Sequence, residues 1–166
     1  MFAPGGGGDA SAMLIQDFVQ VNAPYAFVHG RLLEPRLGWL ADDATAAYAE
    51  GERLFLTVSA TGGEMTVHKR VQVDLGDAYS RGEGVVVPLS WWAAGAERLF
   101  PTLDADLEIM PMGPNQVMLT LMGRYEPPLG AVGRVVNRLV LHRVAEACVR
   151  NFLHRTAANL EHEEAA

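Results

Sequence analysis

Hydrophobic positions along the chain follow two different periods. Six segments have the length and pattern of strands: residues 13–21, 54–60, 66–75, 84–92, 103–111 and 116–125. The third, fifth and sixth of these alternate apolar and polar residues, which is typical of a strand with one buried and one exposed face. The turn at 112–115 separates the last two strands, so we expect them to pair as a hairpin.

The longest uninterrupted pattern lies near the C-terminus, from Pro127 to Leu160. No glycine follows Gly133, and the apolar positions recur at helical spacing. About thirty residues would form a helix of roughly 45 Å. Several charged residues interrupt it, too many for a membrane span: Arg134, Arg138, Arg143, Glu146 and Arg150.

The apolar stripe of this long helix changes side near residues 140–143. The first half carries Val132, Val136, Leu139 and Val140, and the second half carries Leu141, Ala145, Cys148 and Phe152 roughly opposite. A bend would explain the change, and so would coverage of different faces by different layers. A third reading is functional: Arg143 points into a cavity as a polar anchor for a ligand. The alternative for Arg143 is a surface ion pair with Glu146.

Two short helices are predicted after the first strand. The first spans about 24–33, buries Val28 and Leu32, and has Asn22 as a candidate N-cap. After an apolar hinge at 37–40, the second spans 44–50.

Asp42 or Asp43 is the candidate N-cap of this second helix. The order is therefore strand, two short helices, a run of strands and one long helix. Strands joined by hairpins with flanking helices predict an α+β fold with an antiparallel sheet.

We expect a single domain over residues 13–160, with a glycine-rich segment at 1–12 and a charged tail at 161–166. A curved antiparallel sheet wrapped around a long helix leaves space between the two layers, and such spaces commonly hold apolar ligands.

Several short strings resemble the START-like, or SRPBCC, superfamily with its helix-grip fold. Val21-Asn22-Ala23-Pro24 followed by Val28 resembles the opening V-x-A-P-x-x-x-V pattern of that superfamily. Trp39 resembles the tryptophan that many members carry after the first helix. The C-terminal helix, from Pro128-Leu129-Gly130 to Phe152-Leu153, resembles their closing element. The insertion-like segment 93–101 departs from the pattern. The resemblance implies the fold and binding of a hydrophobic or aromatic molecule, with polyketide cyclase/dehydrase-like chemistry if the protein is an enzyme.

The sheet residues expected to line the cavity share one strand parity. They are Val71, Val73, Val87, Leu89, Trp91, Leu107, Leu119 and Leu121. Tyr125 and Arg143 are the polar candidates for ligand contact, and Arg70 is a weaker one because its parity points outward. Trp91 is either a plain core residue or an aromatic wall for a flat ligand.

Three methionines lie on the opposite parity, on the outer face of the last two strands: Met110, Met118 and Met122. A contiguous apolar patch of this kind suggests a partner surface. The rival hypothesis is therefore a non-catalytic interaction module with a filled core, which forms a homodimer through this methionine-rich face.

The remaining composition narrows the function classes. A net charge of −7 over 166 residues argues against nucleic acid as the main partner. One cysteine, Cys148, excludes an intrachain disulfide, and the absence of a signal-peptide pattern predicts a cytoplasmic protein. His142 and Glu146 could supply two metal ligands, but no third is placed, so a helix-surface pair is favoured. No metal, cofactor or catalytic motif is predicted, and the composition is typical of a bacterial protein from a GC-rich genome.

Overall fold

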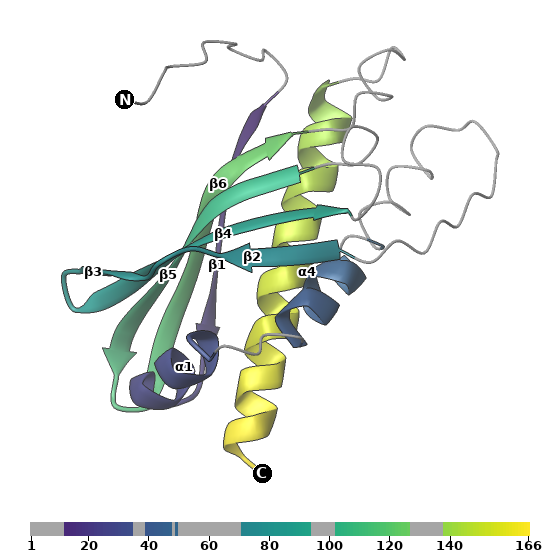
Figure 1. The fold of residues 1–166 in the computed structure, drawn as a ribbon. Helices are drawn as coiled ribbons and strands as arrows, with labels where there is room; N and C mark the ends of the chain where they lie inside the picture. The colour runs from purple at the N-terminus through teal and green to yellow at the C-terminus, as the bar shows by residue number, and fades with distance from the viewer. Residues whose placement is uncertain (1–11, 35–38, 48, 50–70, 94–101, 127–137) are drawn as a thin grey trace.

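The structure is a computed structural model that describes residues 12–34, 39–47, 49, 71–93, 102–126 and 138–166. Within these residues the chain forms an antiparallel sheet with a long helix across one face and two short helices near one end (Figure 1). The predicted α+β helix-grip architecture, a curved antiparallel sheet around a long C-terminal helix, is confirmed.

The described strands form one sheet with the order β1-β6-β5-β4-β2, and β3 pairs with β4 beside this path. Their bounds are β1 Met13–Val21, β2 Val71–Leu75, β3 Tyr79–Arg81, β4 Gly84–Ala93, β5 Thr102–Gly113 and β6 Gln116–Glu126. The predicted hairpin is present, because β5 and β6 pair from Thr102 with Glu126 up to Gly113 with Gln116. The predicted strand 54–60 and the first half of 66–75 lie outside the described residues.

The strand β3 was not predicted. Its three residues, Tyr79 to Arg81, are all exposed, so they carry no alternation that a sequence pattern could reveal. A two-residue turn joins β3 to β4, and Gly82 in this turn has a φ of 59°. Glycine adopts this left-handed conformation without the strain that a side chain would add.

Small residues allow two strands to approach closely in the middle of the sheet. Gly123 of β6 is paired with Ala105 of β5 and with Ile15 of β1. A Cβ atom at position 123 would collide with the Cβ atom of Ala105. A glycine inside a strand often marks close approach or a bend, so this row of small side chains accommodates the curvature visible in Figure 1.

Helix α1, Tyr25–Leu32, confirms the first predicted helix and buries Val28 and Leu32 as expected. The prediction that Asn22 is the N-cap of this helix was wrong, because Pro24 occupies that position. The carbonyl oxygen of Pro24 accepts a hydrogen bond from the amide of Val28 at 3.1 Å. Asn22 lies two residues earlier and bonds to the far helix instead, because the extended proline leaves it outside the first turn.

The second short helix begins earlier than predicted, and residues 39–47 are helical. Residues 39 and 40 of the predicted hinge are therefore helical, and residues 37 and 38 lie outside the described part of the chain. Asp43 cannot be the N-cap, because it lies within the helix and is buried. Its carboxylate accepts hydrogen bonds from a distant side chain, which replaces the local capping bond that sequence proximity suggested.

The long helix α4, Arg138–Glu164, packs along β1 and across the inner face of the sheet (Figure 1). Its buried positions continue the apolar stripe predicted for the second half. Ala145, Val149, Phe152, Leu153 and Leu160 are all less than 2% exposed. Leu139 belongs to the stripe predicted for the first half, and its side chain is exposed. The buried face of α4 is therefore formed by apolar residues between 144 and 160.

Candidate functional site

The inner face of the sheet forms an apolar wall against α4. We call inner wall the set Val71, Val73, Val87, Leu89, Trp91, Leu107, Leu119, Leu121 and Tyr125. All except Val73 are at least 95% buried, and Val73 packs against the others. The strand parity of the sequence thus brings nine of the ten predicted site residues into one cluster. The tenth, Arg143, is exposed on α4.

Trp91 occupies the part of the inner wall that faces the middle of α4. Its ring meets the ring of Phe152 edge-on, with centroids 5.1 Å apart and planes at 75°. This geometry is favourable for two aromatic rings. The indole is 98% buried, and its Nε1 donor has no hydrogen-bond partner. Buried donors are nearly always satisfied in folded proteins, so an orphaned one requires an explanation.

Thr156 lies one helical turn beyond Phe152 on the same side of α4. Its side chain is fully buried, and its hydroxyl makes no hydrogen bond of normal geometry. Thr156 was not among the predicted site residues, although a polar residue on the apolar stripe of Phe152 could have indicated it. Trp91 therefore places an unsatisfied donor in the apolar interior, whereas the Thr156 hydroxyl lies near the buried carboxylate of Asp43.

A hydrogen-bonded pair of side chains, Asp43 and Asn159, joins the short helix of residues 39–47 to α4. Both carboxylate oxygens of Asp43 lie 2.9 Å from Nδ2 of Asn159. Burial raises the pKa of Asp43, whereas the bond from Asn159 and the charge of Arg155 act in the opposite direction. The nearby Asp42 also raises this pKa, and the Thr156 hydroxyl lies close enough to lower it slightly.

The C-terminal part of α4 is also tied to β1 and α1. Oε1 of Glu161 accepts the backbone amide of Asn22 at 2.6 Å and its Nδ2 at 2.8 Å. Arg31 binds both carboxylate oxygens of Glu163, at 2.6 and 2.8 Å, and this bond is the main reason that the pKa of Glu163 is lowered. The opening sequence motif therefore joins β1 to α4: Val21 and Ala23 are buried, and Asn22 between them bonds to Glu161.

Arg31 completes a small cluster around Trp39. Its guanidinium lies 5.7 Å from the centre of the Trp39 ring and also pairs with Glu34. Trp39 is partly buried and packs against the core, and its buried Nε1 likewise has no hydrogen-bond partner. Trp39 therefore supports the junction between the short helices and the end of α4.

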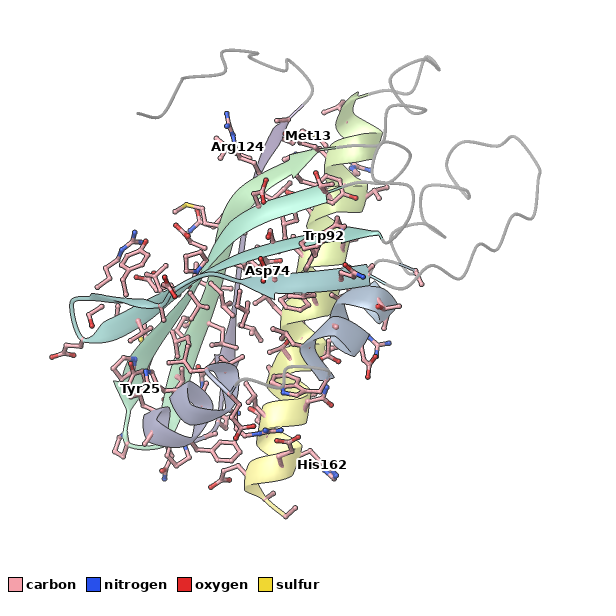
Figure 2. The ribbon with its side chains drawn as sticks, in the orientation of Figure 1. Met13, Tyr25, Asp74, Trp92, Arg124 and His162 are labelled. Carbon is pink, nitrogen blue, oxygen red and sulfur yellow. The ribbon has the colours of Figure 1, made fainter. Side chains whose placement is uncertain are left out.

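The beginning of α4 has a different environment. His142 pairs with Glu146 at 3.3 Å, as predicted for a helix-surface pair. Arg150 bonds to Asp17 of β1 at 3.1 Å. A hollow of about 440 Å³ lies beside this end, lined by Ala12, Met13, Leu14, Arg124, Leu139 and His142. Figure 2 shows Met13 and Arg124 at this end and Tyr25 and His162 at the other.

The outer face of the sheet differs in both charge and exposure. A shallow hollow of about 490 Å³ there is bordered by the carboxylates of Asp74, Asp104 and Asp106. Within the described part of the chain, no three side chains of His, Cys, Asp or Glu are placed to hold a metal ion. None of the described helices combines the length and hydropathy that a membrane crossing needs.

The methionines occupy the outer face as predicted, but they are not its most exposed apolar residues. Met110 and Met118 are half-buried and paired across β5 and β6, and Met122 is 44% exposed. Phe18 and Leu14 of β1 are 63% and 75% exposed on the same face. We call these five residues the outer strip.

Comparison with solved structures finds a similar fold, whereas comparison of the sequence with protein families and curated proteins finds no match. A conserved protein from Geobacillus kaustophilus aligns over 91% of this chain and 97% of its own, with a TM-score of 0.55 and 9% identity. This likeness shows the fold alone.

Two further solved structures align over most of both chains with lower scores. A START superfamily protein from Mycobacterium smegmatis has a TM-score of 0.47 at 11% identity and covers 90% of this chain and 98% of its own. The Zhui aromatase/cyclase of a Streptomyces species has a TM-score of 0.46 at 11% identity, with coverage of 92% and 95%. The sheet and long helix of this chain have the helix-grip arrangement that the sequence predicted.

Proposed function

We propose that the protein binds a hydrophobic or aromatic small molecule between the inner wall and α4. The observation that carries this proposal is the orphaned indole donor of Trp91, which is buried against Phe152 in an apolar wall. A core selected only for packing gains nothing from an unsatisfied N–H group. A buried donor without a hydrogen-bond partner lowers the stability by about 1–3 kcal/mol. A ligand that supplies an acceptor would remove that cost.

The chemistry of the site favours binding and positioning over a self-contained reaction. The inner wall offers apolar surface with a few polar groups, which is the usual composition of a small-molecule site. The solved structures with a similar fold include an aromatase/cyclase. If this chain acts on its ligand, polyketide cyclase/dehydrase-like chemistry by positioning is the candidate reaction. Tyr125 belongs to the wall, and the exposed Arg143 would contact a ligand only near the surface.

Native mass spectrometry of the purified protein tests this proposal. We expect a mass above that of the polypeptide, which disappears on denaturation and releases a small apolar molecule into an organic extract. Trp91→Phe should reduce the occupied fraction, whereas Trp92→Phe is the matched control because Trp92 has the opposite strand parity. An empty protein that also fails to bind added aromatic compounds would contradict the proposal.

The second candidate function is assembly through the outer strip. It is favoured by the exposure of Phe18 and Leu14 on β1, at the edge of the described sheet. A two-fold contact would place one strip against the same strip of a second copy, so apolar surface meets apolar surface. Phe18→Glu should then convert a dimer to a monomer in light scattering, while Leu139→Glu should not. A wild-type monomer at high concentration would exclude this function.

A further inference from the structure

The hollow beside the beginning of α4 brings together the two most exposed leucines of the structure. Leu14 of β1 and Leu139 of α4 both line this hollow of about 440 Å³. Their exposed fractions are 75% and 69%, more than those of the other large apolar side chains in the described part of the chain. Exposed apolar residues that gather at one hollow, rather than lie scattered singly, are typical of a binding surface.

Arg124 brings a positive charge to the same hollow. It belongs to β6 and lies at the end of the sheet where Met13 also lies (Figure 2). Asp104 is directly opposite Arg124 in the β5–β6 register, but its side chain borders the separate hollow on the outer face. Arg124 forms no hydrogen bond or ion pair with the described part of the chain. Its guanidinium is therefore available to an anion.

His142 of α4 is the second polar group that lines the hollow. Its Nε2 lies 3.3 Å from Oε1 of Glu146, so Nδ1 is the ring nitrogen that remains for a ligand. The carboxylate of Glu146 offsets the charge that a protonated imidazole carries. The uncompensated positive charge at the hollow is therefore the single charge of Arg124.

We infer that this hollow binds a small amphipathic carboxylate, which has one negative charge and an apolar body. The planar guanidinium of Arg124 offers two parallel donors, and a carboxylate accepts both. Nδ1 of His142 adds a hydrogen bond, and the apolar body of the ligand covers Leu14 and Leu139. The volume of the hollow lies within the range of small-molecule sites, roughly 300–1,000 Å³.

This site is separate from the inner wall. The described residues that line the hollow include none of the inner-wall residues, and Leu14 and Arg124 pair with each other across β1 and β6 on the outer parity. The inference therefore goes beyond the proposed function and does not depend on it.

Two other ligand classes match the hollow less well. A phosphate monoester carries close to two negative charges at neutral pH, whereas the hollow has one uncompensated positive charge. A neutral hydrocarbon would cover the leucines but would remove water from Arg124 without replacing its hydrogen bonds, which is unfavourable. A carboxylate with an apolar body satisfies both the arginine and the leucines.

Octanoate and octan-1-ol test the inference, because they share one alkyl chain and differ in the charge of the polar end. We expect octanoate to bind the full-length protein about tenfold more tightly, the usual effect of a charge-assisted hydrogen bond. NMR titration that follows the methyl signals of Leu14 and Leu139 measures both affinities. These two sets of signals should move together as octanoate is added.

Variants then locate the preference. Arg124→Gln should weaken octanoate binding about tenfold and leave octan-1-ol binding unchanged. Leu139→Ala should weaken the binding of both probes about threefold, because it removes apolar contact area. Arg81→Gln is the matched control, since it removes an exposed arginine of β3 that does not line the hollow. The substituted side chains are all exposed, so each variant should keep the melting temperature of the wild type.

Each outcome decides the matter. Equal affinity for the two probes overturns the inference, and so does a preference for octanoate that Arg124→Gln leaves intact. A titration that moves the indole N–H signal of Trp91 but not the leucine methyl signals also overturns it, while supporting the proposed function. If octanoate moves the leucine signals in a protein that is empty and binds no aromatic compound, the inference stands and the proposed function fails.

Discussion

The two ends of α4 are held in different ways. Beyond Phe152, polar side chains connect the helix to three other elements: Asn159 to Asp43, Glu161 to Asn22, and Glu163 to Arg31. Before Phe152, the described polar contacts include the pair His142–Glu146 within the helix and Arg150–Asp17 to β1. We call the three contacts beyond Phe152 the C-terminal clamp.

This difference shows which end of α4 polar contacts hold in place. The clamp combines buried and exposed contacts over less than two turns of helix, so it fixes that end of α4 to β1, α1 and the short helix. At the other end Arg143 is exposed, and the exposed Leu139 lines a hollow. Among the described residues, polar contacts therefore anchor the C-terminal half of α4 to three separate parts of the chain.

The largest expected effect compares two leucines on the same helix. Leu160→Ala should lower the free energy of unfolding by about 2–5 kcal/mol, because Leu160 is 1% exposed and its loss leaves a cavity. Leu139→Ala should change it by less than about 0.5 kcal/mol, because Leu139 is 69% exposed. Urea unfolding followed by circular dichroism measures both. Equal losses would contradict the difference between the two ends.

A smaller effect compares two glutamates. Glu161→Ala should cost about 1 kcal/mol, because one carboxylate oxygen accepts two hydrogen bonds from Asn22 and water partly replaces them. Glu146→Ala should cost about 0.3–0.5 kcal/mol, the usual value for a pair one helical turn apart. The same unfolding measurement applies. A larger loss for Glu146→Ala would show that the beginning of α4 is the better anchored end.

The buried carboxylate of the clamp predicts a pH dependence of stability. Burial raises the pKa of Asp43, so the folded protein binds this proton more tightly than the unfolded chain does. The resulting stabilisation is fully present below the unfolded pKa, near 3.9, and is lost as the pH rises through the folded pKa. The stability of the wild type relative to Asp43→Asn should therefore fall between pH 4 and neutral pH, measured by urea unfolding. A constant difference would show that Asp43 does not titrate differently on folding.

The smallest expected effect concerns the exposed part of the clamp. Arg31→Lys should cost less than about 1 kcal/mol, because a lysine cannot make the two-pronged contact with Glu163 but such surface pairs contribute little. The loss should shrink further at high salt, since screening weakens exposed ion pairs. Thermal unfolding at two salt concentrations measures this. A salt-independent loss would point to the contact with the Trp39 ring instead.

Strand periodicity predicted the inner wall because side chains in a strand alternate strictly between two faces. Val87, Leu89 and Trp91 therefore had to share a face once the strand was recognised. Leu14 and Phe18 could not be placed in the same way, since apolar residues occupy both faces of β1 and hide the alternation. Periodicity thus resolves a strand with one polar face and fails on a strand with two apolar ones.

The polar contacts of the clamp were not predictable, because they join residues more than 100 positions apart. Asn22 and Asp43 both stand where a local pattern suggests a helix cap, and the local interpretation was wrong for each. Their real partners, Glu161 and Asn159, are set by how α4 lies on the sheet. The sequence could not show that the Trp91 donor lacks a partner either, because that depends on which side chains pack around it.

The indole N–H resonance of Trp91 offers the most direct test of ligand binding at the inner wall. The chain has three tryptophans, and the missing signal in Trp91→Phe identifies the one at position 91. On titration with an aromatic compound that carries a hydrogen-bond acceptor, this signal should move downfield as its proton gains that acceptor, while the signal of Trp92 stays in place. A saturating titration that leaves the Trp91 signal unmoved would contradict the account.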